Sequence, residues 1–156
     1  MNNHVQSVLH QIEFAIKTLI QMMDELDNSD LNKRPTTNKA SIGELLEHLT
    51  NICEADLMIG NSVSEREMKH YYSSVSYNSI SEMKIAINRN FLQLKKHYLS
   101  LSGVDLTEKV TTYWGVSYTR YEWLLEILAH LYHHRGQLHA MLVHCCNKEL
   151  KVSLFE

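Results

Sequence analysis

The sequence predicts an all-α protein in which four long helices form one bundle. Four stretches place apolar residues at intervals of three and four positions, which is the spacing of one helical face. Three of these stretches open with Ser or Thr followed three positions later by Glu, the pattern of a capped helix start. The 156 residues include a single proline, Pro35, so little interrupts long helices. We therefore expect one domain spanning residues 1–156.

The first helix is expected from residue 5 to residue 23. Turn-forming residues at positions 27–30 should end it, and Pro35 disfavours helix in the residue before it. The first connection of the bundle therefore contains an extended stretch around Pro35. The face of this helix that should be buried carries Val5, Val8, Leu9, Ile12, Ile16, Leu19, Ile20 and Met23.

The second helix should begin at Ser41, because Ser41 and Glu44 have the spacing of a capping box. In a capping box the Ser side chain accepts a hydrogen bond from a free backbone amide, and the Glu side chain accepts one in return. His48 and Asp56 fall on the apolar face of this helix, so two polar side chains interrupt a buried row. The rest of that row is Leu45, Leu49, Ile52 and Ile59.

The third helix should begin at Ser79 and end before Ser102-Gly103. Ser79 and Glu82 repeat the capping-box spacing. Residues 110–118, further along, are rich in β-branched and aromatic side chains around a glycine. We expect a short hairpin or an extended crossover there. The apolar row of the third helix is Met83, Ile87, Phe91, Leu94, Tyr98 and Leu101.

The fourth helix carries the candidate chemistry. Thr119 and Glu122 supply the third capped start. His130 and His134 then lie on the same stripe as the apolar residues of this helix, so we expect both imidazoles to point into the bundle. The apolar members of the stripe are Trp123, Ile127, Leu138 and Met141.

Charge and hydropathy exclude several classes of protein. The net charge is −3 with histidine neutral, and the 15 Lys and Arg residues are scattered, so no basic stripe suits a nucleic acid. No apolar run approaches the ~18 residues that a membrane-spanning helix needs. The N-terminal residues lack the basic and apolar segments of a signal peptide, so we expect neither membrane insertion nor secretion.

The cysteines indicate a reducing compartment. The chain has three, Cys53, Cys145 and Cys146, and two of them are adjacent, which is a poor basis for a disulfide framework. We therefore expect a cytoplasmic protein. Cys53 is more readily a packing residue than a metal ligand or reactive thiol. Cys145 and Cys146 could bind metal or oxidise, but no third donor accompanies them.

Three histidines indicate a transition-metal site. His130 and His134 are four residues apart, so their rings project from adjacent turns on one side of a helix. His48, on the inner face of the second helix, would supply a third nitrogen. Three neutral nitrogen donors suit Zn²⁺, Ni²⁺ or Fe²⁺ and leave the remaining positions to water, as in catalytic sites. The alternative is a set of hydrogen-bonded core histidines without metal, because ten histidines offer many chance pairs.

Neighbouring polar residues are weaker candidates for the metal site. His133 and His139 fall away from the stripe, and we exclude both from the metal set. Asp56 and Glu126 either orient an imidazole through its second nitrogen or are ordinary surface carboxylates.

Two segments around the three histidines carry a family pattern. Residues 41–49 read Ser-Ile-Gly-Glu-Leu-Leu-Glu-His-Leu, and residues 130–137 read His-Leu-Tyr-His-His-Arg-Gly-Gln. These segments resemble the second-helix histidine segment and the fourth-helix His-x-x-x-His-Arg-Gly-Gln signature of the DinB/YfiT-like superfamily of metal-binding four-helix bundles. The resemblance spans nearly the whole chain.

This resemblance implies an up-down-down-up bundle, often a homodimer, with one metal held by His48, His130 and His134. It also includes Gly136 and Gln137. We expect Gly136 to permit the close approach of another helix and Gln137 to donate a hydrogen bond near the site.

Similar bundles include low-molecular-weight thiol S-transferases and isomerases, and fold alone does not determine function. We expect first a metal-dependent thiol S-transferase, in which the metal lowers the pKa of a small thiol for attack on an electrophile. A metal-dependent hydrolase with Asp56 or Glu126 as the base is the second hypothesis. The third is a non-catalytic stress-response protein that stores or senses metal.

Overall fold

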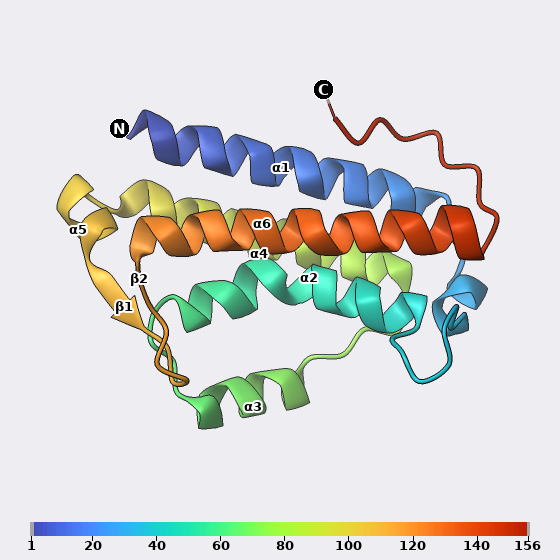
Figure 1. The fold of residues 1–156 in the computed structure, drawn as a ribbon, viewed down its shortest axis with the longest axis horizontal. Helices are drawn as coiled ribbons and strands as arrows, with labels where there is room; N and C mark the ends of the chain where they lie inside the picture. The colour runs from blue at the N-terminus through green and yellow to red at the C-terminus, as the bar shows by residue number, and fades with distance from the viewer. Residues whose placement is uncertain (1, 156) are drawn as a thin grey trace.

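The computed structural model describes residues 2–155, and four long helices form its body (Figure 1). Along the chain in Figure 1, the first and last of them run in one direction and the middle two run in the opposite direction, as predicted. α2 packs against α4 and α6, and α1 packs against the same two helices. The expected four-helix bundle is confirmed. Its long helices are α1 (Asn3–Asp24), α2 (Ile42–Ile59), α4 (Ile80–Ser100) and α6 (Arg120–Ala140).

α2, α4 and α6 start where the capping patterns predict. Ser41 Oγ accepts a hydrogen bond from the Glu44 amide at 3.1 Å, and the Glu44 carboxylate accepts one from the Ser41 amide at 2.7 Å. The same reciprocal pair forms between Thr119 and Glu122 at the start of α6. Ser79 caps α4 through its side chain. These local bonds determine where α2 and α6 begin, and so which residues they turn toward each other.

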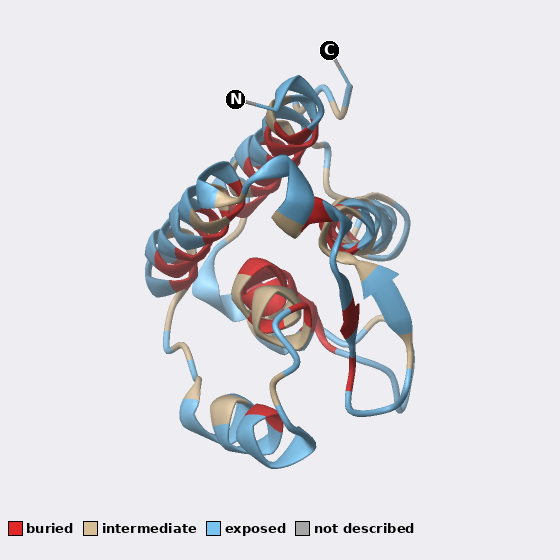
Figure 2. Cartoon of the chain, turned by 90° about the vertical axis from the view of Figure 1, so that its left-hand side faces the viewer, coloured by how far each residue is buried: buried red, intermediate tan, exposed pale blue. Residues whose placement is uncertain are grey.

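The core fills the space between the four helices, where their buried faces meet (Figure 2). It is mainly aliphatic, with methionines from α1 and α4 that fit irregular gaps. Within residues 2–155, no helix has both the length and the apolar character that crossing a membrane requires. The largest fully buried side chains include Ile12, Leu19, Met22, Met23, Leu46, Leu49, Ile87 and Leu94.

Three short helical elements were not expected: η1 (Asn28–Asn32), α3 (Glu65–Ser74) and α5 (Gly103–Thr107). α3 matters most, because it runs back beneath α2 and lets α4 start at the same end of the bundle as α2 (Figure 1). Its only buried residue is Met68, so it has little of the apolar periodicity that identifies a helix in a sequence.

The crossover before α6 is a hairpin, as the β-branched residues of this stretch indicated. β1 (Lys109–Thr111) and β2 (Ser117–Thr119) pair antiparallel, with Val110 opposite Tyr118. Gly115 in the turn has a φ of 91°, a conformation that favours glycine. The indole of Trp123 donates a hydrogen bond to the Val110 carbonyl at 3.3 Å, so the hairpin is fastened to α6.

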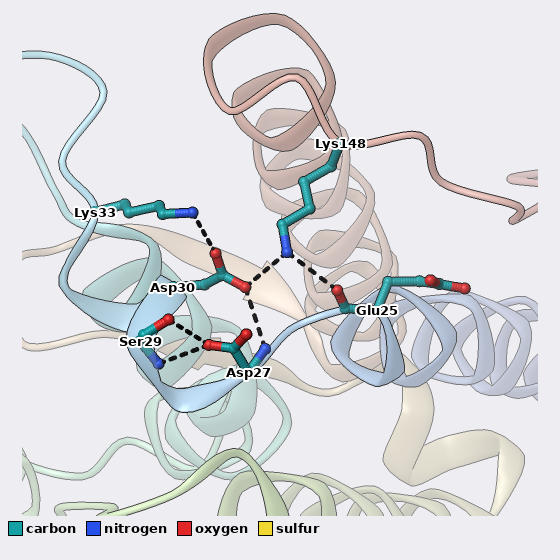
Figure 3. Close-up of polar contacts among 6 residues, drawn as sticks. All are labelled: Glu25, Asp27, Ser29, Asp30, Lys33 and Lys148. Carbon is teal, nitrogen blue, oxygen red and sulfur yellow. Dashed lines mark hydrogen bonds and ion pairs between the residues drawn. The ribbon is translucent and has the colours of Figure 1, made fainter.

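Beyond α6, the chain passes through a π-helical turn, η2 (Met141–Cys145), and residues 146–155 lack regular structure. Lys148 of this segment donates hydrogen bonds to the Asp30 carboxylate at 2.8 Å and to the Glu25 carbonyl at 3.3 Å (Figure 3). Lys33 and the Asp27 amide also donate to Asp30, at 2.5 and 3.1 Å.

The Asp30 carboxylate is almost inaccessible, with a residue exposure of 1%. Burial by itself would raise its pKa, but the hydrogen bonds from Lys148, Lys33 and the Asp27 amide outweigh burial and lower the pKa to about 2. The C-terminal segment is therefore tied to the first connection of the bundle by a buried, charged contact.

Candidate metal centre

Three imidazoles meet at the seam between α2 and α6. His48 comes from the second turn of α2, and His130 and His134 come from consecutive turns in the middle of α6. One ring nitrogen from each lies within 4.8 Å of the other two. Among residues 2–155, this is the only group of three or more His, Cys, Asp or Glu side chains close enough to hold a metal ion together. The structure thus brings together the three histidines that the sequence singled out.

The ring contacts are close. His48 Nε2 lies 3.0 Å from His130 Nε2. The ring centroid of His48 lies 5.0 Å from that of His130 and 4.5 Å from that of His134, with the rings at steep angles to each other. The rings are therefore not stacked face to face, and the convergence of their nitrogens rests on the distances between those atoms.

Two of the imidazoles are held by hydrogen bonds at Nδ1. His130 Nδ1 donates to the Asp56 carboxylate at 2.7 Å, and His134 Nδ1 donates to Gln137 Oε1 at 2.8 Å. A carboxylate or amide oxygen can only accept, so each contact places a ring proton on Nδ1, and in the neutral ring Nε2 is then an acceptor. Metal-binding histidines in proteins are oriented by such outer partners.

The local electrostatics keep His48 uncharged. Burial, followed by the neighbouring His134 and His130, lowers the pKa of His48 to about 4. Burial also lowers the pKa of His134, although its hydrogen bond to Gln137 opposes the effect. His130 differs, because its hydrogen bond with Asp56 raises its pKa. At neutral pH, His48 therefore presents a neutral imidazole, the form that binds a metal.

The donor set fits a transition metal. Two nitrogens bound to one ion at about 2.1 Å, in tetrahedral or octahedral geometry, lie about 3.0–3.4 Å apart. The 3.0 Å separation of the His48 and His130 Nε2 atoms is at this value. Three imidazoles leave a tetrahedral ion one position, and an octahedral ion three, for water or substrate. The cluster could therefore hold a metal ion and still bind a ligand.

The remaining candidate residues lie outside the group of three imidazoles. Glu126 is exposed and makes no hydrogen bond to a ring of the cluster, so of the two proposed orienting carboxylates only Asp56 occupies that position. His133 and His139 do not belong to the cluster. Cys53 is fully buried, and burial raises the pKa of its thiol, which agrees with a packing role.

Two expectations for the end of the motif are wrong. Gly136 does not permit a close helix contact, since a Cβ built there would meet no atom within 4 Å. The close approach is instead at Gly43, where a Cβ would lie 2.9 Å from the Leu31 carbonyl oxygen. Gln137 serves His134 through its carbonyl oxygen, so toward the site it accepts a hydrogen bond and does not donate one.

Arg135, between these residues, has a structural position that sequence reasoning did not assign. Its side chain is buried, and Nη1 donates to Thr18 Oγ1 of α1 at 2.6 Å. The guanidinium also lies over the Tyr132 ring at 4.3 Å and near Phe155 of the C-terminal segment at 5.6 Å. Arg135 thereby fastens the helix that carries two of the histidines to α1.

A four-helix bundle with a histidine cluster between its second and last long helices defines a class of helical proteins with a candidate metal centre. The chain belongs to the DinB superfamily, whose family model matches residues 11–138. No curated protein matches the chain.

Solved structures share the fold of this chain. A protein assigned to the DinB family from Exiguobacterium sibiricum 255-15 superposes with a TM-score of 0.87 at 28% identity, over 99% of each chain. A DinB-like protein from Bacillus cereus ATCC 10987 gives 0.73 at 18% identity, over 95% of this chain and 96% of its own. A DinB-like protein from Bacillus subtilis gives 0.70 at 12% identity, over 92% and 94% of the two chains, and shows the shared fold alone.

Proposed function

We propose that His48, His130 and His134 bind one divalent transition metal, Zn²⁺, Ni²⁺ or Fe²⁺, and that the protein is a metal-dependent thiol S-transferase acting on small electrophiles. The observation that carries the proposal is the convergence of three ring nitrogens, two of them on rings whose Nδ1 protons are held by Asp56 and Gln137.

The residues of such a site would have two roles, as metal ligands and as groups that orient the ligands. His48, kept neutral by burial, and the two α6 histidines would act as ligands and not as nucleophiles. Asp56 and Gln137 orient two of the rings from behind. The bound ion would supply Lewis acidity that lowers the pKa of a thiol, so that the thiolate is available near neutral pH.

The reactive sulfur would come from a separate thiol molecule. Cys53 is the cysteine nearest in sequence to His48, but it is fully buried and its pKa is raised, so it cannot serve as a nucleophile. Cys145 lies eleven residues beyond His134, which is roughly 16 Å along a helix. A small thiol from solution can reach the open coordination positions without any such residue.

Thiol transfer is favoured over hydrolysis because neither nearby carboxylate, Asp56 or Glu126, is free to act as a base. A hydrolase needs a base that accepts a proton from water. Asp56 already accepts the Nδ1 proton of His130, with only 15% of its side chain exposed, and Glu126 points to solvent. Neither is placed as a free base beside the ring nitrogens.

The test begins with metal content. The untagged protein should carry nearly one equivalent of transition metal by elemental analysis, and the folded His48→Ala/His130→Ala/His134→Ala variant should carry almost none. A His133→Ala/His139→Ala variant is the matched control, because it removes two histidines of the same helix that lie outside the cluster. It should retain the metal of the parent.

The metal-loaded protein is then assayed for consumption of cysteine in the presence of an electrophile such as iodoacetamide. The rate should depend on thiol and should disappear in the triple variant. Absence of metal from the parent, even after reconstitution with each of the three ions, would refute the site. Turnover of ester or amide substrates without thiol would replace the transferase with a hydrolase.

A further inference from the structure

Exposed aromatic side chains gather on α3, which contacts α2, and on the hairpin, which contacts α6. Tyr72 of α3 is 50% exposed, and Tyr113 and Trp114 at the tip of the hairpin are 48% and 49% exposed. A single exposed aromatic residue is ordinary on a protein surface, but several in one region mark a binding surface.

The distribution of exposed apolar residues is uneven. Among residues 2–155, the large exposed apolar residues of α4 are aliphatic, namely Ile85, Leu92 and Leu99. The exposed aromatic ones, apart from Phe155 of the C-terminal segment, all lie on α3 and the hairpin. In Figures 1 and 2 these two elements stand on the outer side of α2 and α6, away from α1 and α4. The exposed aromatic residues therefore belong to the two elements on the α2–α6 side of the bundle.

The hairpin tip holds its two aromatic residues in a defined place. The Gly115 amide donates to the Thr112 carbonyl at 2.9 Å, so Tyr113 and Trp114 occupy the two corners of a tight turn. Such corners usually carry Gly, Pro, Asn, Asp or Ser, and local turn chemistry does not explain two aromatic rings there. The rings contact each other edge to face, with centroids 4.7 Å apart.

The hairpin is also fixed relative to α3. Ser62, in the connection between α2 and α3, donates to the Thr111 carbonyl of β1 at 3.1 Å. Burial and then the nearby charges of Asp56 and Tyr113 raise the pKa of Tyr72, which agrees with a phenol placed between the hairpin tip and the carboxylate behind His130. The hairpin tip and α3 thus lie side by side (Figures 1 and 2), and Tyr72 is near Asp56, the carboxylate that contacts His130.

We propose that Tyr72, Tyr113 and Trp114 form an aromatic platform that binds the planar aromatic part of the electrophile. This inference rests on the proposed function and names the substrate class, an aromatic electrophile in preference to an aliphatic one. With an aryl chloride, the thiolate sulfur forms a bond to the ring carbon, the carbon–chlorine bond breaks, and chloride leaves with the bonding electrons. The thiol proton passes to solvent.

The kinetic test compares two electrophiles in the metal-loaded protein, with cysteine as the thiol. The measured quantity is the ratio of kcat/KM for chlorodinitrobenzene to kcat/KM for iodoacetamide. The Tyr72→Ser/Tyr113→Ser variant should lower this ratio about tenfold, because ring stacking is lost for only one of the two substrates. The Ile85→Ser/Leu92→Ser variant, which changes exposed aliphatic residues of α4, should leave the ratio unchanged. An unchanged ratio in the tyrosine variant would overturn the proposal.

A second measurement separates this inference from the proposed function. Dinitrobenzene, which has no leaving chloride, should quench the tryptophan fluorescence of metal-free protein. Trp123, the other tryptophan, is buried, so the quenching reports on the exposed Trp114. The Tyr72→Ser/Tyr113→Ser variant keeps this tryptophan and should need a several-fold higher dinitrobenzene concentration for the same quenching. If neither electrophile reacts, the proposed function fails and the quenching alone decides the platform. Equal quenching in parent and variant would then refute it.

Discussion

The Asp30 cluster and the histidine cluster both join segments that are distant in the sequence, yet they differ in how their polar atoms are satisfied. Asp30 accepts hydrogen bonds from Lys148, Lys33 and the Asp27 amide, all within the protein. In the histidine cluster, two Nε2 atoms face each other at 3.0 Å while outer partners hold Nδ1 protons.

This difference distinguishes a structural contact from a candidate metal centre. A buried charge that is fully hydrogen-bonded stabilises the fold and leaves no donor or acceptor for a ligand. In the histidine cluster the closest contact is the 3.0 Å hydrogen bond between His48 Nε2 and His130 Nε2, and either ring can supply its proton, so this contact changes with the protonation of the rings. The polar atoms of Asp30 are therefore satisfied within the protein, whereas the three imidazoles of the histidine cluster could hold a metal ion.

The largest expected effect is metal-dependent stability. Zn²⁺ at a hundred times its Kd should raise the free energy of unfolding of the parent by about 2.7 kcal/mol. The corresponding rise in Tm is about 5–10 °C and can be followed by differential scanning calorimetry. The His48→Ala/His130→Ala/His134→Ala variant should show no rise, whereas the His133→Ala/His139→Ala control should behave as the parent. An equal rise in the triple variant would contradict the comparison.

The second effect concerns Asp30→Asn. The variant should lose on the order of 2 kcal/mol in free energy of unfolding near pH 7, measured by urea denaturation. The pKa of Asp30 is lowered from 3.8 to about 2 in the folded protein, so its contribution is present above pH 4. The difference between parent and variant should shrink as the pH falls from about 4 to about 2.

Lys33→Gln provides the control for this prediction. The Lys33 side chain is 48% exposed, so its loss should cost less than about 1 kcal/mol. A destabilisation by Asp30→Asn that remains constant from pH 7 to pH 2 would show that charge is not its cause.

The third effect is on metal affinity. Asp56→Asn keeps an oxygen that can accept the proton of His130 Nδ1 but removes the negative charge, and the Kd for Zn²⁺ should rise about tenfold in chelator-competition titrations. Glu126→Gln changes an exposed carboxylate of α6 that contacts no ring of the cluster, so its Kd should equal that of the parent. Equal affinities for all three proteins would remove Asp56 from the site.

The smallest effect comes from two glycines, one near each cluster. Gly136→Ala adds a methyl group into open space within a helix and should raise the free energy of unfolding by about 0.5–1 kcal/mol. Gly43→Ala should lower it, because the new Cβ would lie 2.9 Å from the Leu31 carbonyl oxygen. Thermal denaturation of both variants measures the two changes in stability. A Gly43→Ala variant more stable than Gly136→Ala would contradict this prediction.

The helices that local chemistry defines were predictable. Ser41, Ser79 and Thr119 each cap a long helix, because a cap depends only on residues three positions apart. α3 has the same cap at Ser64 and Glu67, but its solvated surface conceals the helix from a search for apolar faces. A systematic search for capping boxes would have found it.

For the site, helical phase predicted that His48, His130 and His134 face the inside of the bundle. It offered Asp56 and Glu126 equally as orienting carboxylates, and only Asp56 contacts a ring. That they bind metal stays a prediction. Phase could not show that the neighbour of His134 Nδ1 is Gln137 acting as an acceptor, nor that Gly136 faces open space. Both depend on where other elements lie, which periodicity along one helix does not specify.

The pairing of His48 with His130 also affects the order of events during folding. The two rings are 82 residues apart in the sequence, and α6 is the last long helix to leave the ribosome. Contacts this distant form only after most of the loop-closure entropy has been overcome. The nascent chain could therefore bind an ion at these histidines only after α6 has docked against α2. A bound ion would then slow the dissociation of α6 from the bundle.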